Sequence, residues 1–452
     1  MTAARFEVVS GGGDGARRGV LTLERTGARV ETPAFMGYTR HGLHPHLVPD
    51  VAAEVGGLPA VTRVQAEDFL GGGRWLGGGG GVRALAGLAA GGVVVLDVLD
   101  PTVAGRAGRA GAKAMAIEAA GGTVRLGPGD FAALAAALQP DVVVPPADYV
   151  AEALPSLERG KRIEKSVERS ARWLDEYLAQ ARHPAAVLAP VMGAHSAALR
   201  ERSARALGAR RGLLGYAFND GGLALPLERR LDLARQSLAH LDGGGLRYMA
   251  GAAAPDAALR AVLAGMDLVD SSYAYAVTEQ GFASTYALAC DSPAARLDLW
   301  HESMRADFRP LAAGCACFAC ARHHRAYIHH LLATREMLAT VLLQAHNLHV
   351  YARFFADVRR SLAAGTLPAD AARFAAHYGP DAFDELRLLA AQQATATPTT
   401  KVQRRRHTSG PGDIRDHPPS KTTAPTAEPK PKSSATTTTS AGGGGDSRSG
   451  GD

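Results

Sequence analysis

The sequence predicts an α/β protein whose main domain is a closed (β/α) barrel. Three observations predict it. The chain has 452 residues, enough for one large barrel or for two or three smaller domains. Its hydrophobic content of 46% can fill a substantial core. Between residues 90 and 275, short apolar runs alternate with helical patterns.

Six of the apolar runs in this region are expected to be buried strands. They are GVVVLDV (92–98), DVVVPPA (141–147), AAVLAPVM (185–192), GLLGYAF (212–218), LRYMAGA (246–252) and MDLVDSS (266–272). The helical patterns between them include FAALAAALQ (131–139), RIEKSVERSARWLDEYLAQA (162–181) and LERRLDLARQSLAHL (227–241). Continuous apolar strands that alternate with helices indicate a parallel sheet covered on both faces. Six or more such units favour a closed barrel over an open doubly wound sheet.

A (β/α) barrel carries its chemistry at the carboxyl ends of the strands. The positions expected there are Asp97, Ala147, Met192, Asn219, Ala252 and Asp270. An aspartate at a strand end is more often structural than catalytic, because acid–base function needs partners within reach.

Composition argues against a membrane or secreted protein. No uninterrupted apolar run approaches the roughly 20 residues of a membrane span, and the N-terminus MTAARFEVVSGGGDGARRG lacks the apolar core of a signal peptide. Three of the four cysteines lie within one short segment, which is not a disulfide framework. We therefore expect a reducing, cytoplasmic location; association with the outer surface of mitochondria stays open.

The net charge of +6 lies mostly in the C-terminal tail, where residues 401–452 hold nine Lys or Arg and five Asp or Glu and so contribute +4. From about Thr395 the chain is rich in Thr, Ser, Pro, Gly and Lys and has no aromatic residue. We expect residues 393–452 to be disordered. Within them, KVQRRRH (401–407) is either a solvated basic run or a nuclear or RNA-contacting patch.

The glycine runs at 11–13, 71–73 and 77–81 do not indicate a phosphate-binding loop. None is followed by Lys-Ser or Lys-Thr, and none lies cleanly between a strand and a helix.

The segment CACFAC (315–320) indicates a metal site, because a tight Cys-x-Cys-x-x-Cys turn can direct Cys315, Cys317 and Cys320 to one ion. Zinc prefers four nitrogen or sulfur ligands, so one imidazole would complete a structural site. The candidates are His323, His324, His329, His330, His346 and His349, and composition does not choose among them. Free buried thiols are an alternative, as is an iron–sulfur site that would need Cys290.

The segment CACFACARHHRAYIHHLLATREMLATVLLQAHNLHVYARFF (315–355) resembles the zinc-binding signature of tRNA-guanine transglycosylases. The resemblance extends through GMDLVDSSYAYAVTEQGFASTYAL (265–288), ALQPDVVV (137–144) and RIEKSVERSARWLDEYL (162–178), and covers about residues 5–365. It implies a (β/α)8 TIM-like barrel over residues 1–392, with an inserted C-terminal zinc-binding subdomain at about 308–360. It also implies one Zn2+ per subunit, held by Cys315, Cys317, Cys320 and His346. The family's reaction replaces guanine at the wobble position of certain tRNAs with queuine or a precursor base.

The chain departs from the catalytic members of that family. They have T-D-S-G-G-F-Q where this chain has VLDVLDPTV (95–103), and VMGA (191–194), FNDGG (218–222) and SSYAYAVTEQG (271–281) replace further motifs of the base pocket. Asp270 stands at the position of the family nucleophile. The pattern resembles the non-catalytic accessory branch of the family, which implies a heterodimer with a catalytic subunit and contact with tRNA through the complex. Two alternatives stay open: an active transglycosylase that uses Asp270, and a zinc-stabilised RNA- or protein-binding module.

Two surfaces are candidates for binding partners. The predicted helix 326–360 has a broad apolar stripe, which fits burial against a partner subunit or within one subunit. Lys161, Lys165, Arg169 and Arg172 share one helical face and could follow tRNA phosphates. Interspersed glutamates favour a solvated, internally paired face instead.

Overall fold

The computed structural model describes residues 4–11, 15–55, 58–70, 80–98, 100–102, 110–119, 122–150, 156–219, 225–379 and 381–384. They all belong to one compact unit, Met1–Thr397. The predicted disordered tail, with its basic run at 401–407, lies outside the described residues.

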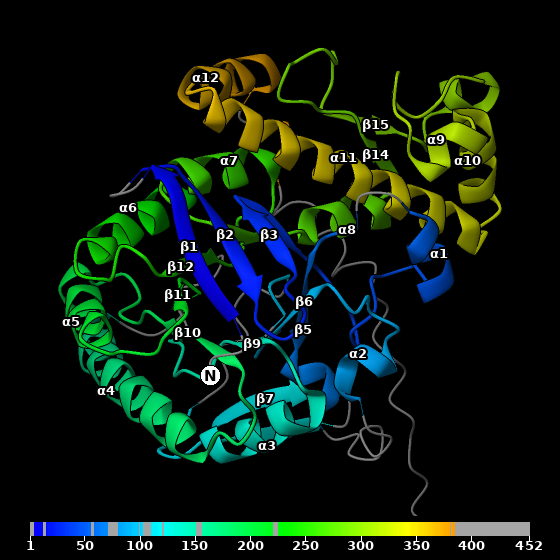
Figure 1. Cartoon of the computed structure of the whole chain (residues 1–452). Helices are drawn as coiled ribbons and strands as arrows, with labels where there is room; N and C mark the ends of the chain where they lie inside the picture. The colour runs from blue at the N-terminus through cyan, green and yellow to red at the C-terminus, as the bar shows by residue number, and fades with distance from the viewer. Residues whose placement is uncertain are drawn as a thin grey trace, which may run out of the picture. The chain divides into compact units, whose positions relative to one another are not determined.

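Eight parallel strands form the closed barrel that the sequence predicts (Figure 1). In order around the barrel they are β4 (Ala34–Gly37), β5 (Val61–Gln65), β6 (Val93–Asp97), β9 (Val142–Val143), β10 (Ala186–Pro190), β11 (Gly215–Ala217), β12 (Leu246–Met249) and β13 (Leu268–Asp270). The ring closes where β13 pairs with β4. Each of the six predicted apolar runs contains one strand, β6 or β9 to β13. The first two strands, β4 and β5, come before residue 90 and were not predicted.

Helices surround the barrel and cover its outer face (Figure 1). They are α1 (Pro49–Glu54), η1 (a 3-10 helix, Ala66–Phe69), α2 (Gly81–Leu85), α3 (Pro128–Leu138), α4 (Ser156–Gln180), α5 (Ala197–Gly208), α6 (Leu227–Leu238), α7 (Pro255–Leu263) and α8 (Ser272–Glu279). The predicted helices at 131–139, 162–181 and 227–241 correspond to α3, α4 and α6. A hairpin of β7 (Met115–Ala119) and β8 (Gly122–Leu126) precedes α3.

An antiparallel sheet of β1 (Ala4–Gly11), β2 (Arg17–Leu23) and β3 (Arg29–Thr32) packs on the amino ends of the barrel strands. Its apolar face shares one buried cluster with Ala34, Val61, Val93, Val142 and Ala186, which begin or lie near the start of their strands. The fully buried guanidinium of Arg17 pairs with Asp267, with 2.9 Å between Nε and Oδ1. This end of the barrel is therefore closed, which leaves the carboxyl end for a site.

The C-terminal part of the described chain forms a subdomain on a long helix. It contains β14 (Phe282–Ser284), β15 (Arg296–Asp298), η3 (a 3-10 helix, Glu302–Ala306), α9 (Phe318–Arg322), α10 (Arg325–Ala333) and the first part of α11 (Met337–Ala363). The last helix, α12 (Leu367–Tyr378), packs with the core of the barrel and its helices instead. A separate buried cluster that starts at Ala283 and includes Leu311 and Ile328 fills the subdomain. The predicted zinc-binding segment, at about residues 308–360, lies within this part of the chain.

The predicted helix 326–360 is two helices, α10 and α11, separated at Arg335, whose φ is 58°. Leu342 and Leu343 on α11 pack in the subdomain core, whereas Tyr351 and Phe354 pack in the core of the barrel and its helices. Burial within this one chain thus accounts for the broad apolar stripe of α11. Within the part of the chain that the structure describes, no helix combines the length and apolar composition needed to cross a membrane.

Candidate metal centre and barrel mouth

Cys315, Cys317, Cys320 and His346 converge on one point in the C-terminal subdomain. Their ligand atoms all lie within 4.8 Å of one another. Cys317 is the N-cap of α9, and its Sγ accepts the backbone N–H of Cys320 at 3.3 Å. This cap folds the Cys-x-x-Cys segment into the first turn of α9 and brings both sulfurs to one side. His346 comes from α11 and is fully buried.

The spacing of these atoms fits a tetrahedral metal ion. His346 Nδ1 lies 3.8, 3.4 and 3.4 Å from the Sγ atoms of Cys315, Cys317 and Cys320. In a tetrahedral zinc site, bond lengths of about 2.3 Å to sulfur and about 2.0 Å to nitrogen place sulfur and nitrogen about 3.5 Å apart. The four side chains could therefore hold a metal ion, and the donor set is consistent with zinc.

Surrounding hydrogen bonds orient the imidazole toward the sulfurs. His346 Nε2 lies 2.8 Å from the carbonyl oxygen of Ser284, so Nε2–H donates there and the Nδ1 lone pair faces the cysteines. The next residue, Asn347, accepts the backbone N–H of Ser284 at 2.8 Å and donates to Thr278 Oγ1 at 2.9 Å. The pair His346–Asn347 thereby joins α11 to β14 and α8.

Two of the other candidate histidines have different contacts. His324 accepts the N–H of Tyr327 as the N-cap of α10, and His329 Nδ1 lies 2.8 Å from the carbonyl oxygen of Leu299. The thiol of Cys290 contacts the carbonyl oxygen of Leu288 and is not part of the cluster. Among the described residues, the cluster thus has three thiols and one imidazole, which does not match the four-thiol iron–sulfur alternative.

At the carboxyl end of the barrel, Asp97 is held by a buried cation. Alternation along β5 and β6 places Arg63 and Asp97 on the inner face, as it places Val61 and Val93. Arg63 donates to Asp97 Oδ2 from Nη2 at 2.9 Å, and Asn219 Nδ2 donates to the same oxygen at 3.0 Å. Arg63 and Asp97 are each 2% exposed.

The protonation of this cluster is set by burial and charge. Burial lowers the pKa of Arg63, but interactions with Tyr248 and Asp97 more than offset it and raise this pKa above its ordinary value. Burial raises the pKa of the Tyr248 hydroxyl well above its usual value, so Tyr248 stays protonated and lies 3.5 Å from Asp97 Oδ2 as a donor. Asp97 thus belongs to an internal ion pair surrounded by donors.

Asp270, the last residue of β13, is bonded through both of its oxygens. Oδ2 accepts the N–H of Gly251 at 2.7 Å. Oδ1 accepts the N–H of Ser272 at 3.0 Å and its hydroxyl at 2.5 Å. The carboxylate is fully buried. These bonds link β13 to the start of α8 and to the residues after β12.

Asp148, which follows Ala147 in the segment after β9, is also paired. Arg162 Nη1 donates to Asp148 Oδ2 at 2.6 Å, and Arg169 donates to the same oxygen. Some hydrogen-bonding capacity remains nearby: the Gln65 amide has no partner among the described residues, nor has Asn219 Oδ1. The mouth thus keeps polar groups for contact, while each of its three strand-end carboxylates is engaged within the chain.

A family model described as queuine tRNA-ribosyltransferase matches residues 13–380. The chain belongs to the queuine tRNA-ribosyltransferase family. A protein of Xenopus tropicalis is 31% identical over 408 residues, which cover 79% of this chain and 95% of that protein. A protein of Danio rerio is 32% identical over 406 residues, which cover 78% and 94%. A protein of Drosophila erecta is 29% identical over 384 residues, which cover 80% and 90%. All three are named queuine tRNA-ribosyltransferase accessory subunit 2.

Membership of the queuine tRNA-ribosyltransferase family agrees with the resemblance in the sequence, but sequence reasoning missed parts of the mouth. Arg63 was not singled out, because β5 itself was not recognised. A signal existed in VTRVQ, where a basic residue interrupts an otherwise strand-like segment. Met192 was expected at the mouth, yet its side chain lines a hollow between α4 and α5 on the outer wall.

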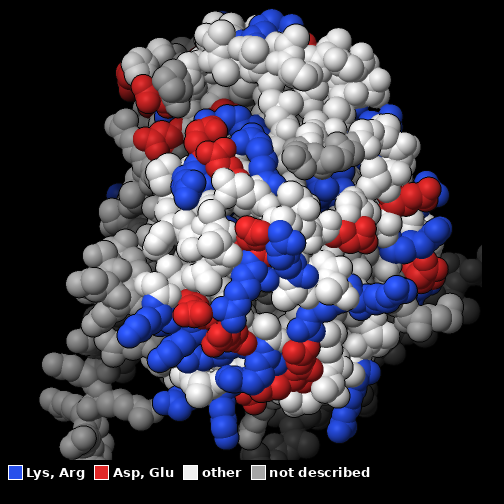
Figure 2. Space-filling model, turned by 90° about the vertical axis from the view of Figure 1, so that its left-hand side faces the viewer, with Lys and Arg blue, Asp and Glu red and all other residues white. Residues whose placement is uncertain are grey.

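The basic residues on the candidate face of α4 differ in their contacts, and the arginines among them are paired with carboxylates. Arg169 turns inward to Asp148, and Arg172 pairs with Glu176 at 3.4 Å. Glu164 and Glu168 pair with Arg202 of α5. Lys161 and Lys165 stay exposed. Figure 2 shows the side of the molecule that carries these helices, with basic and acidic side chains interspersed. The face is therefore mostly paired, as the interspersed glutamates predict.

Proposed function

We propose that this chain is the non-catalytic subunit of a heterodimeric queuine tRNA-ribosyltransferase in the cytoplasm. A catalytic homologue would exchange guanine for queuine at the wobble position of tRNAs with GU(N) anticodons, those for aspartate, asparagine, histidine and tyrosine. The names of the relatives support an accessory role. tRNA would be bound through the complex.

The observation that carries this proposal is the state of the carboxylates at the barrel mouth. Base exchange needs a carboxylate free to attack the anomeric carbon of ribose and a second group free to move a proton. Asp270 accepts three hydrogen bonds through its two oxygens, and Asp97 is neutralised by buried Arg63. Freeing either carboxylate would cost those interactions and leave a buried charge unpaired. These contacts disfavour catalysis by this chain.

We assign a structural Zn2+ to Cys315, Cys317, Cys320 and His346, one ion per subunit. With four protein ligands, no position remains for water, so the ion would supply folding energy rather than chemistry. It would tie α9 to α11, and through the Nε2–H of His346 to β14. The metal centre would thereby give the subdomain a rigid outer surface.

We assign that outer surface to the catalytic partner. Large apolar side chains stand exposed on the subdomain: Phe308 is 73% exposed, Met337 84% and Trp300 51%. Such side chains supply much of the binding energy at protein interfaces. They flank the zinc-bound segment along the chain, which makes the subdomain, rather than the core-packed half of α11, the expected contact.

Radiolabelled guanine exchange into tRNA tests the proposal. We expect no exchange by this chain alone, and exchange when the catalytic partner is added, with a complex of one copy of each by mass measurement. Exchange by this chain alone would instead establish an active transglycosylase that uses Asp270. Failure to associate with any transglycosylase would favour the RNA- or protein-binding module.

A further inference from the structure

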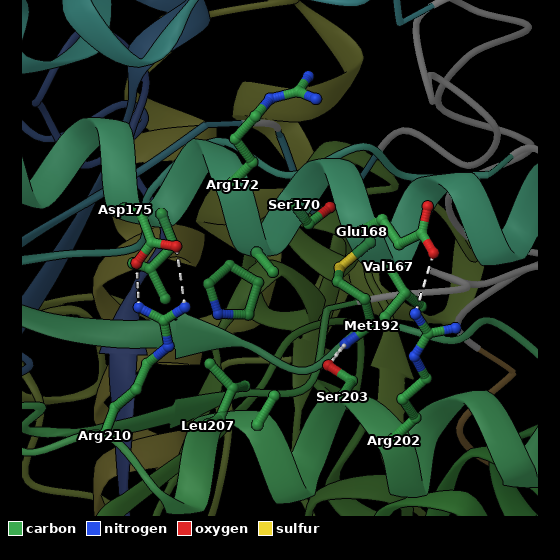
Figure 3. Close-up of a pocket in the computed structure, with 14 residues that line it drawn as sticks. Val167, Glu168, Ser170, Arg172, Asp175, Met192, Arg202, Ser203, Leu207 and Arg210 are labelled. Atoms are coloured by element: carbon green, nitrogen blue, oxygen red, sulfur yellow. Dashed lines mark hydrogen bonds and ion pairs between the residues drawn. The ribbon is translucent and has the colours of Figure 1, made fainter.

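A hollow of about 400 Å³ opens on the outer wall of the barrel between α4 and α5 (Figure 3). Its apolar lining includes Val167 and Leu174 from α4, Leu207 from α5, and Pro190 and Met192 from the end of β10 and the residues after it. The volume and mostly apolar lining match those of small-molecule sites.

Ion pairs between the two helices span this hollow. Arg202 of α5 reaches Glu164 at 3.1 Å and Glu168 at 2.9 Å on α4. Farther along, Arg210 pairs with Asp175 of α4, with 3.1 Å between Nη2 and Oδ2 (Figure 3). These bridges obstruct a helix or a long peptide along the groove. Because the guanidiniums already have carboxylate partners, the rim does not select a charged ligand.

Two buried hydroxyls give the hollow a specific polar character. Ser170 Oγ accepts the backbone N–H of Asp148 at 2.9 Å, and Ser203 Oγ accepts that of Met192 at 3.0 Å. Each serine is 6% exposed. Within the described part of the chain, neither hydroxyl has an acceptor for its own proton, so each can donate one hydrogen bond to an occupant.

The same hydroxyls hold the backbone after two neighbouring barrel strands. Asp148 follows β9 and Met192 follows β10, both toward the barrel mouth. Figure 3 shows Ser170 on the α4 side and Ser203 on the α5 side, with Met192 between the helices. A molecule bonded to the hydroxyls would restrain the backbone at both strand ends.

We propose that this hollow binds a small, uncharged, largely apolar molecule that carries a hydrogen-bond-accepting oxygen. Bound there, the molecule accepts from the serine hydroxyls and stiffens the chain after β9 and β10. The site is distinct from the metal centre and does not depend on the accessory role proposed above.

Nuclear magnetic resonance of protein labelled at its methionine methyl groups tests the site, because Met192 lines it. The chain has 8 methionines, and Met192→Leu assigns the resonance. Acetophenone, an uncharged ketone, is the probe; ethylbenzene lacks the oxygen and benzoate carries a charge. We expect acetophenone to shift the Met192 signal saturably, with a dissociation constant on the order of millimolar for a ligand of this size. Ethylbenzene and benzoate should each bind at least about threefold more weakly.

Two controls decide whether the hollow is the place of binding. Ala206→Phe fills it from an exposed position on α5 and should weaken acetophenone binding about tenfold or more. Ala133→Phe, on the exposed face of α3, should leave binding unchanged.

Hydrogen exchange gives a second measurement: bound acetophenone should slow the exchange of the Asp148 and Met192 amides. The proposal is overturned by an absent or unsaturable Met192 shift, by equal binding in Ala206→Phe, or by equal binding of ethylbenzene.

Discussion

The candidate metal centre and the barrel mouth both gather charged or polar side chains from distant segments. They differ in what the sulfur, nitrogen and oxygen atoms of those side chains face. At the metal centre, three sulfurs and one nitrogen face a common point, and the fourth ligand is oriented by a bond on its other side. At the mouth, the carboxylates of Asp97 and Asp148 face guanidiniums of the same chain. The comparison teaches that convergence of side chains alone does not make a binding site. Their lone pairs must also be free of partners within the chain.

The largest effect is expected at the metal centre. Cys320→Ser should abolish stoichiometric metal binding, because one of four ligands is lost. Structural zinc contributes on the order of 10 kcal/mol in small zinc domains, so we expect the melting temperature to fall by about 10 °C or more. Metal analysis and thermal unfolding measure both. Cys290→Ser, outside the cluster, is the control and should change neither; retained metal in Cys320→Ser would contradict the assigned ligand set.

The next effect is expected at the mouth. Arg63→Met leaves Asp97 buried without its cation, which should cost about 3–5 kcal/mol of unfolding free energy in urea titration. Arg63→Met combined with Asp97→Leu should be less destabilised than Arg63→Met alone, because no unpaired charge remains. Arg202→Ala, an exposed pair member, should cost less than about 1 kcal/mol. A double variant no more stable than Arg63→Met alone would show that the unpaired charge of Asp97 is not the cause of the loss.

A smaller effect is expected at the proposed partner surface. Phe308→Ala combined with Met337→Ala should weaken association with the catalytic partner by about 2 kcal/mol, or roughly 30-fold, since both side chains are exposed and apolar. Val9→Ala, an exposed apolar residue on β1, should not alter affinity. Calorimetric titration measures the difference. Equal affinities for all variants would place the partner elsewhere.

The smallest effect concerns Asp270. Asp270→Asn keeps the shape of the side chain but replaces one accepting oxygen with an NH2 donor. At least one accepted bond is therefore lost, and we expect unfolding to become easier by about 1 kcal/mol. Guanine exchange by the assembled complex should stay within about twofold of the unmodified level. A hundredfold loss would make Asp270 catalytic, and the two regions would then differ less than proposed.

Local patterns predicted much of the barrel but not its first strands. The runs that contain β6 and β9 to β13 are apolar because both faces of the sheet are covered. The segment VTRVQ of β5 does not follow that rule, since Arg63 and Gln65 point into the barrel. Burial of Arg63 becomes favourable only because Asp97 lies on the neighbouring strand. A pattern read one segment at a time cannot contain that information.

By itself, the sequence predicted the (β/α) barrel class and the three clustered cysteines as candidate ligands, because both depend on spacing between near neighbours along the chain. Spacing alone left the histidine open; the family resemblance implied His346, and the tertiary structure brings it to the cysteines. Tertiary structure also decided which carboxylates are neutralised. His346 reaches the sulfurs only after α11 folds back over the subdomain, and Asn219 reaches Asp97 only once the barrel closes. Such pairs depend on strand register and closure, which bring together side chains far apart in the chain.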